Sequence, residues 1–350
     1  MRLAPRTPFY RKIALMETQS FQPSYLSLYP SGKLHKRAES LEARLASCDL
    51  CPRNCGVNRL AGEIGFCRSV AQPIVASVCT HHGEEPPLSG TKGSGTIFFG
   101  NCTMRCIYCQ NHQISQDPHK MRGHEISVTA LAHEMLRVQD ELGCHNINLV
   151  SPTHFVPQIV RALCEAVPLG LHLPLVYNTS GYDSVETLKL LDGIIDIYLP
   201  DIRYASDTSA KKYSRTPDYV ENARAAIKEM HRQVGGIVVD NAGVALRGLI
   251  VRHLILPGGL AGSEESLTWL AGNISPGVHI SMMAQYYPAH RAARFPELAR
   301  HITPVEYGHV MDVMDRLGME NGWVQELDSP DNYRPDFGQS DHPFERAPSA

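Results

Sequence analysis

From Thr96 onward the chain alternates between short apolar runs and longer segments with helical periodicity. The apolar runs are rich in β-branched residues and span 96–99, 146–150, 173–177, 194–199, 249–256 and 278–286. Helical patterns, with apolar residues three and four positions apart, span 127–142, 155–166, 184–191, 219–234, 263–271 and 305–317. We therefore predict six strands, each followed by a helix, and a further late strand at 323–327.

This alternation predicts the fold class. Strands joined by helices return in the same direction, because the crossover connections of a sheet are right-handed. We expect an α/β fold in the form of an open, partial (β/α)6 barrel. One helix is clearly delimited, with Ser127 at its N-cap and Gly143 as its C-terminal stop. In such a barrel the loops at the C-terminal ends of the strands converge on one pocket.

Composition and charge exclude several classes of protein. The 350 residues carry 33 basic and 36 acidic groups, which leave a formal net charge of -3, and 43% are hydrophobic. This is typical of a soluble globular protein. Every apolar stretch is interrupted well before the roughly 18 residues of a membrane span, and the near-neutral charge gives no basic footprint for nucleic acid. We expect no membrane and no nucleic-acid partner.

The N-terminal residues indicate the compartment. Residues 1–16 contain four basic groups, but the apolar run at 13–16 is too short for a secretory signal. A transit peptide is the alternative, which Pro5 and Pro8 disfavour because they interrupt an amphipathic helix. We expect a cytoplasmic protein with reduced thiols, so its ten cysteines indicate metal or redox sites rather than disulfides.

The most informative motif directly follows the first predicted strand. Cys102, Cys106 and Cys109 have the spacing C-x3-C-x2-C, and Tyr108 stands just before the last cysteine. Three thiolates on one loop can hold three irons of a [4Fe-4S] cluster. No fourth cysteine adjoins them, so one iron is left open for a ligand from outside the chain. A zinc site completed by His112 is the alternative.

This motif, placed after the first strand, resembles that of the radical S-adenosylmethionine (SAM) superfamily. The resemblance implies two cofactors, a [4Fe-4S] cluster and S-adenosyl-L-methionine, whose amino and carboxylate groups chelate the open iron. It implies reductive cleavage of SAM to a 5'-deoxyadenosyl radical, which abstracts hydrogen from a substrate. It also implies a low-potential electron donor such as flavodoxin or ferredoxin.

Over roughly residues 84–317 the chain looks closest to proteins similar to pyruvate formate-lyase activating enzyme. The resembling stretches are 84–100, 145–154, 176–182, 198–204 and 251–258. Residues 201–203 read Asp-Ile-Arg where the activases have Asp-Leu-Lys, and residues 288–290, Pro-Ala-His, resemble their Pro-x-His. The resemblance implies that the protein activates a glycyl-radical partner protein.

One departure from the activases concerns the contacts to SAM. They have Gly-Gly-Glu at the end of the second strand, where this chain has Ser-Pro-Thr at residues 151–153. Backbone carbonyls and the Thr153 hydroxyl can still accept hydrogen bonds from an ammonium group. We expect the cofactor-binding residues to be Tyr108, Ser151, Thr153, Asn178, Ser180 and Asp201. For those in loops, an ordinary turn role is the alternative.

A second group of cysteines precedes the predicted barrel. Cys48, Cys51, Cys55 and Cys67 lie within twenty residues, among several Gly and Pro. Four thiolates at these spacings predict a second metal site, which holds either zinc or an auxiliary iron-sulfur cluster. Unliganded thiols are the alternative.

These patterns divide the chain into four parts. We expect an N-terminal extension at residues 1–40, a cysteine-rich metal-binding segment at 41–83, the partial barrel at 84–328 and a flexible tail at 329–350.

The expected function is that of a radical SAM enzyme that activates a glycyl-radical protein. One alternative is radical modification of a small molecule or a peptide. Another, from a different class, is a non-catalytic iron-sulfur or zinc protein for electron transfer or scaffolding. The motifs name neither the substrate nor catalytic residues outside the cofactor site.

Overall fold

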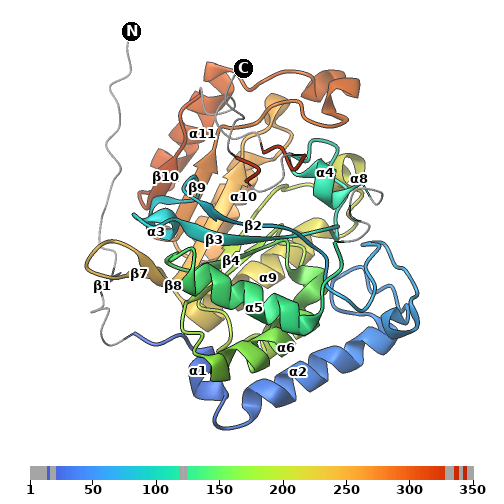
Figure 1. Ribbon diagram of the computed structural model, residues 1–350. Helices are drawn as coiled ribbons and strands as arrows, with labels where there is room; N and C mark the ends of the chain where they lie inside the picture. The colour runs from blue at the N-terminus through green and yellow to red at the C-terminus, as the bar shows by residue number, and fades with distance from the viewer. Residues whose placement is uncertain are drawn as a thin grey trace, which may run out of the picture.

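A ten-stranded, mainly parallel β-sheet lies at the centre of the described part of the chain (Figure 1). The computed structural model describes residues 14–15, 21–117, 121, 124–327, 335–338 and 342–344. The rest of the predicted N-terminal extension and tail lies outside the described residues. The strands are β1 (Ala14–Leu15), β2 (Val75–His81), β3 (Ser94–Phe99), β4 (Ile147–Val150), β5 (Leu175–Thr179), β6 (Ile197–Pro200), β7 (Val238–Val239), β8 (Ala245–Leu254), β9 (His279–Met283) and β10 (Gly322–Val324).

The strands that carry the site run parallel. Neighbouring strands pair in the order β3, β4, β5, β6, β8, β9 and β10. The long strand β8 pairs with β6 through Gly248 and Leu249 and with β9 through Ile250 to Leu254. At one edge, β2 pairs antiparallel with β3. The six predicted strands and the late strand are confirmed, and their carboxyl ends meet at the same edge of the sheet.

Helices follow the strands as the periodicity predicts, which confirms the α/β class. They are α1 (Tyr25–Leu28), α2 (Lys33–Ala43), α3 (Pro86–Ser89), α4 (His112–Ser115), α5 (Val128–Asp140), α6 (Val156–Ala166), α7 (Val185–Leu190), α8 (Asp207–Ser214), α9 (Tyr219–Val234), α10 (Ser263–Asn273) and α11 (Pro304–Arg316). Figure 1 shows α5 beside the sheet, with α6 and then α2 further from it. Among these helices none combines the length and the apolar composition that a bilayer span requires.

The helix ends show why these segments form helices. The Ser127 hydroxyl accepts a hydrogen bond from the Ala130 N–H at 3.0 Å, which caps α5 as predicted. Thr303 and Glu306 form a reciprocal capping box at the start of α11. These caps satisfy backbone N–H groups that lack a partner inside the helix.

The segment before the cysteine-rich region is part of the core. Tyr25, Leu34 and Ala38 are fully buried, and α2 packs against α6. The Tyr25 hydroxyl donates to the Leu173 carbonyl at 2.8 Å, and the Ser24 N–H donates to the Asp196 carboxylate at 2.9 Å. The described part of the predicted N-terminal extension is therefore anchored to β5 and β6.

Two short pieces of the predicted tail also contact the sheet. The Phe344 ring stacks on His81 with ring centroids 3.9 Å apart, and Phe337 packs edge-on against Phe98. His342 bonds to the Thr80 carbonyl at 2.6 Å. These described pieces lie against β2 and β3, so they add to the wall of the cavity that these strands border.

Candidate functional site

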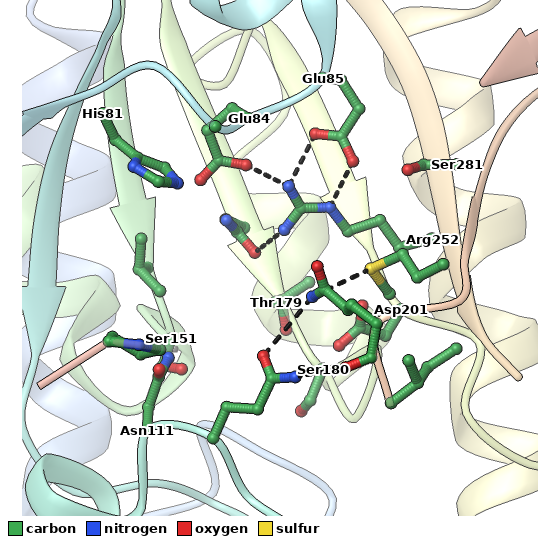
Figure 2. Close-up of a pocket in the computed structure, with 18 of the residues that line it drawn as sticks. His81, Glu84, Glu85, Asn111, Ser151, Thr179, Ser180, Asp201, Arg252 and Ser281 are labelled. Carbon is green, nitrogen blue, oxygen red and sulfur yellow. Dashed lines mark hydrogen bonds and ion pairs between the residues drawn. The ribbon is translucent and has the colours of Figure 1, made fainter. Parts of the chain in front are cut away.

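A cavity of about 830 Å³ opens at the carboxyl ends of the parallel strands (Figure 2). Residues at the ends of β4, β5, β6, β8 and β9 contribute to its wall, together with the cysteine loop that follows β3. The predicted site residues in the wall are Cys102, Cys106, Tyr108, Cys109, Ser151, Asn178, Ser180 and Asp201. The structure thus brings together residues from four separate loops, as the strand-end argument predicts.

Backbone hydrogen bonds hold the cysteine loop in place. The Arg105 N–H donates to the Ser214 carbonyl at 3.0 Å, and the Ile107 N–H donates to the Tyr213 carbonyl at 2.9 Å. Asn101, at the start of the loop, has a φ of 67° and donates its N–H to Ile114. The loop is therefore positioned by α8 on one side and by α4 on the other.

Each cysteine sulfur of this loop has a hydrogen-bonding neighbour. The Ser214 hydroxyl donates to the Cys106 sulfur at 3.0 Å, and the Met104 N–H donates to the Cys102 sulfur at 3.4 Å. The Cys109 sulfur and the Ser115 hydroxyl lie 3.3 Å apart. Donors aimed at sulfur suit thiolates that bind iron, because such bonds stabilise negative charge on the ligand.

The electrostatics of the loop disfavour free thiolates. Burial raises the pKa of Cys109 to about 12, and nearby Cys106 adds to the effect. Burial also raises the pKa of Cys102. The sulfurs would therefore stay protonated unless a cation such as iron compensates their charge.

A chain of hydroxyl groups leads from the cavity to Cys106. The Tyr108 and Tyr204 hydroxyls are 2.5 Å apart, and the Tyr204 hydroxyl lies 2.7 Å from that of Ser214, which bonds the Cys106 sulfur. The Tyr108 ring is buried edge-on against Tyr204 and Tyr286. Tyr108 is thus fixed beside the cysteines.

Two carboxylates and an arginine form a buried cluster in the same cavity (Figure 2). Arg252 of β8 pairs with Glu84 and, at 2.6 and 2.7 Å, with Glu85. Its remaining nitrogen lies 3.4 Å from the Asn178 amide oxygen. Burial alone would raise the pKa of Glu85, but the charge of Arg252 outweighs it and lowers that pKa below its ordinary value.

The wall carries an excess of acidic groups. Its acidic residues are Glu84, Glu85, Asp201 and Glu326, and its arginines are Arg203 and Arg252. Arg203 pairs with Asp201, whose pKa is raised by burial in spite of this partner. Four acidic side chains against two guanidinium groups make the cavity suitable for a ligand with net positive charge.

Thr153 lies apart from the other predicted contacts. It is buried outside the cavity wall, and its hydroxyl donates to the Asp183 carboxylate at 2.7 Å. Tyr177 and Thr179 donate to the same carboxylate. Thr153 therefore supports the loops beneath Ser151 rather than facing the cavity.

The four upstream cysteines line a second, much smaller cavity. Its wall contains Cys48, Cys51, Cys55 and Cys67 together with Arg53, Arg59 and His154. Burial raises the pKa of Cys51, with smaller contributions from the other three thiols. All ten cysteines are free. Within the described ranges no three His, Cys, Asp or Glu side chains converge as the ligands of one metal ion.

The two groups of cysteines are neighbours. Arg53 donates to the Thr103 carbonyl at 3.1 Å, and its guanidinium lies 3.6 Å from the centre of the Phe66 ring. Arg105 donates to the Phe66 carbonyl at 2.7 Å and packs over the same ring. The loop of Cys67 is thus joined directly to the loop of Cys102.

Three residues of the cavity escape the motif analysis: Glu84, Glu85 and Arg252. Arg252 and Glu85 are 167 residues apart in sequence. The signal that could have identified them is an arginine inside the otherwise apolar run 249–256, since a buried charge requires a partner. The adjacent acids at 84 and 85 lie in the stretch 84–100, whose only signal is its resemblance to the activases.

Comparison with protein families supports this interpretation of the site. Residues 96–244 match the family model described as the Radical SAM superfamily. The matched segment contains the three-cysteine loop and the ends of β4, β5 and β6. This segment of the chain is therefore similar to the radical SAM superfamily.

Two proteins of Methanocaldococcus jannaschii are similar in sequence. The uncharacterised protein MJ0674 is 27% identical over 279 residues, which are 78% of this chain and 76% of that protein. The uncharacterised protein MJ0808 is 28% identical over 221 residues, which are 58% of this chain and 63% of that protein.

Solved structures show weaker similarity. HydG, a maturase of the [FeFe]-hydrogenase, has a TM-score of 0.42 and 12% identity over 64% of this chain, which spans about half (48%) of HydG. Methylornithine synthase (PylB) has a TM-score of 0.40 and 11% identity over 87% of this chain and 76% of its own.

Proposed function

We propose that this protein is a radical SAM enzyme whose cluster is held by Cys102, Cys106 and Cys109. The observation that carries the proposal is the loop itself. Its three cysteines share one cavity wall, each sulfur has a hydrogen-bonding neighbour, and no other described cysteine lies in that wall. When bound, a reduced [4Fe-4S] cluster supplies an electron to the sulfonium of SAM, which breaks into methionine and a 5'-deoxyadenosyl radical.

The cavity wall provides the contacts that SAM requires. SAM carries an ammonium, a sulfonium and a carboxylate, so its net charge is positive and matches the acidic excess of the wall. Asp201, Asn178 and the two loops that carry Ser151 and Ser180 are assigned to hold its polar groups, and Tyr108 to pack against its adenine. Glu84 supplies a carboxylate that the missing Gly-Gly-Glu motif would otherwise provide.

We assign the parallel strands and their helices to a partial (β/α)6 barrel of the radical SAM type, over residues 84–328. The continuous order from β3 to β9 and the strand-end cavity support this assignment. The cysteine-rich part at 41–83 forms a separate metal-binding segment in this scheme, with the extension at 1–40 and the tail at 329–350 flanking both.

The upstream cysteines are proposed to bind a second iron-sulfur cluster or zinc. Their shared cavity supports a common ligand, and Arg53 and Arg59 in its wall would offset the negative charge of four thiolates. Iron, zinc and sulfide analysis of a variant in which Cys102, Cys106 and Cys109 are all replaced by Ala tests the content of this site alone. If the variant contains neither iron nor zinc, the upstream cysteines bind no metal, which would contradict this proposal.

The radical is proposed to act on a glycyl-radical partner protein in a reducing, cytoplasmic compartment. Residues 201–203 and 288–290, which resemble activase motifs, support this target. Incubation with a candidate partner and detection of a glycyl radical by electron paramagnetic resonance tests it. A SAM-dependent change in a small molecule or peptide, with no protein radical, would point to the other target class.

Anaerobic turnover tests the enzymatic activity. The reconstituted protein is incubated with SAM and dithionite, and 5'-deoxyadenosine is measured by chromatography. We expect product from the native sequence and none from Cys106→Ala. Equal amounts from both would contradict the proposal, because the activity would not need the cysteine loop.

A further inference from the structure

The sheet that carries the cavity has two open edges, β2 and β10. Among the described strands, β2 pairs with β3 and β10 pairs with β9, and the two edges do not pair with each other. Residues of both edges line the main cavity, with His81 and His82 at the end of β2 and residues 323–326 at and after β10. The cavity therefore extends across the gap between these edges.

Two described pieces of the C-terminal region border this cavity, residues 335–338 and residues 342–344. Pro335 and Phe344 belong to the cavity wall. The pieces are joined to each other, because the Asp336 N–H donates to the Pro343 carbonyl at 2.7 Å. We call the two pieces together the strap. Figure 1 shows the strap in dark red, beside β2 and near α4.

The first piece of the strap is fixed by one amide side chain of α4. The Gln113 side chain accepts a hydrogen bond from the Phe337 N–H at 2.8 Å and donates one to the Asp336 carboxylate at 3.0 Å. The Phe337 ring also packs edge-on against Phe98, with ring centroids 5.2 Å apart. This piece is thus held near the cysteine loop, which directly precedes α4 in the chain.

The second piece is fixed at the far end of β2. The Phe344 ring stacks on His81 with ring centroids 3.9 Å apart, and a ring nitrogen of His342 lies 2.6 Å from the Thr80 carbonyl oxygen. Thr80 and His81 pair with the first residues of β3, so this contact lies at the end of β3 opposite to the cysteine loop. The strap therefore follows the cavity from one end of β3 to the other.

The strap is attached less firmly than the strands beside it. In the described part of the chain no strap residue belongs to a strand, and Asp336 and Gly338 are exposed. Its contacts to the sheet and to α4 are side-chain hydrogen bonds and ring contacts. A segment held in this way opens at a lower free energy than a core strand, whose backbone hydrogen bonds break together. The strap can leave without disruption of the sheet.

We infer that the strap closes the cavity and moves away from it to admit a protein substrate. The purpose of this closure rests on the proposed function, because a carbon radical has to be kept from side reactions and a loop of a partner protein needs a wide entrance. With the strap in place a cavity of about 830 Å³ remains, which is within the size range of small-molecule sites. The strap thus separates the binding of a small cofactor from the entry of the larger substrate.

The first test measures how well the strap covers the cavity. Trp323 is half-buried in the cavity wall, and Trp269→Phe leaves it as the only tryptophan. Acrylamide quenching of its fluorescence lifetime is measured in the full chain with its cluster reconstituted. The test variant is Gln113→Ala with Phe344→Ala, which removes one anchor from each piece. The matched control is Gln139→Ala with Tyr29→Ala, which removes a half-buried amide and a half-buried ring outside the cavity wall.

We expect the quenching constant of the test variant to exceed that of the control about twofold or more, because release of the strap exposes the wall. Equal constants in the two variants would overturn the inference.

The second test measures whether the strap opens in the native chain. Hydrogen–deuterium exchange is followed by mass spectrometry in peptides from the strap and from β2. We expect the strap amides to exchange about tenfold or more faster than those of β2. Equal protection of both segments would overturn the inference, since the strap would then be a fixed part of the sheet. Neither test requires SAM cleavage, so absence of 5'-deoxyadenosine from the native protein would overturn the proposed function separately.

Discussion

At the scale of single residues, the cysteine sulfurs and their neighbours define the chemistry. Ser214 lies 105 or more residues from the cysteine loop in sequence. Its hydroxyl nevertheless lies 3.0 Å from the Cys106 sulfur and 2.7 Å from the Tyr204 hydroxyl. Hydrogen bonds to ligand sulfurs raise the reduction potential of a cluster, because the reduced state carries more negative charge.

Removal of that donor should lower the potential. Ser214→Ala is expected to shift the midpoint of the loop cluster by about 40 mV to more negative values, which corresponds to one hydrogen bond of about 1 kcal/mol. Redox titration monitored by electron paramagnetic resonance measures it. Ser266→Ala is the control, since this buried hydroxyl has no partner in the described structure. An unchanged potential in Ser214→Ala would remove Ser214 from the cluster environment.

The buried cluster of Arg252, Glu84 and Glu85 is expected to be sensitive to loss of its cation. Arg252→Leu leaves two buried carboxylates unpaired and should lower the free energy of unfolding by roughly 3–5 kcal/mol. Adding Glu84→Gln and Glu85→Gln to the same chain should recover much of that loss. Urea unfolding of the three chains gives the comparison. A triple variant no more stable than Arg252→Leu would show that charge is not the cause.

At the scale of secondary-structure elements, hydrophobic periodicity predicted the parallel strands β3, β4, β5, β6, β8 and β9. It did not predict the short helices α4 and α8, which position the cysteine loop. It succeeds here because strands such as β4 and β5 are buried on both faces, while helices such as α5 and α9 present one apolar side. Periodicity gives no information about which side chains meet across the sheet. The pairing of Glu84 with Arg252 depends on how far β8 extends past β6, which only the folded sheet determines.

The glycines of these elements provide a matched pair of predictions. A Cβ at Gly95 of β3 would lie 2.1 Å from a Val138 methyl group of α5, whereas a Cβ at Gly308 of α11 would meet nothing within 4 Å. We expect Gly95→Ala to lower the melting temperature and Gly308→Ala to raise stability by roughly 0.5–1 kcal/mol. Thermal unfolding of both variants measures this. A Gly95→Ala protein as stable as the native one would show that α5 is not packed tightly on β3.

At the scale of the whole molecule, one buried carboxylate connects the N-terminal region to the sheet. Asp196 accepts hydrogen bonds from the Ser24 N–H at 2.9 Å and the Leu175 N–H at 3.1 Å. Burial raises its pKa to about 6. Asp196 lies inside the apolar run 194–199, where a buried charge requires a partner, but the sequence does not identify that partner.

This carboxylate predicts a pH dependence of stability. The pKa of Asp196 is higher in the folded than in the unfolded chain, so protonation of this carboxyl stabilises the fold. That stabilisation is complete below about pH 4 and is lost as the pH rises through about 6. The loss amounts to at most about 3 kcal/mol. Asp196→Asn should therefore gain stability relative to the native chain between pH 4 and 7. Urea unfolding at several pH values measures the free energy of unfolding of both chains. A difference between the two chains that stays constant across this pH range would contradict the prediction.

The account as a whole depends on an open iron at the three-cysteine loop. Electron–nuclear double resonance of the reduced protein, with SAM labelled with ¹⁵N at its amino group, tests this most directly. We predict a coupling between the label and the cluster, present in the native protein and absent from Cys106→Ala. A cluster that shows no coupling to bound SAM, or a single zinc ion at Cys102, Cys106 and Cys109, would contradict the account.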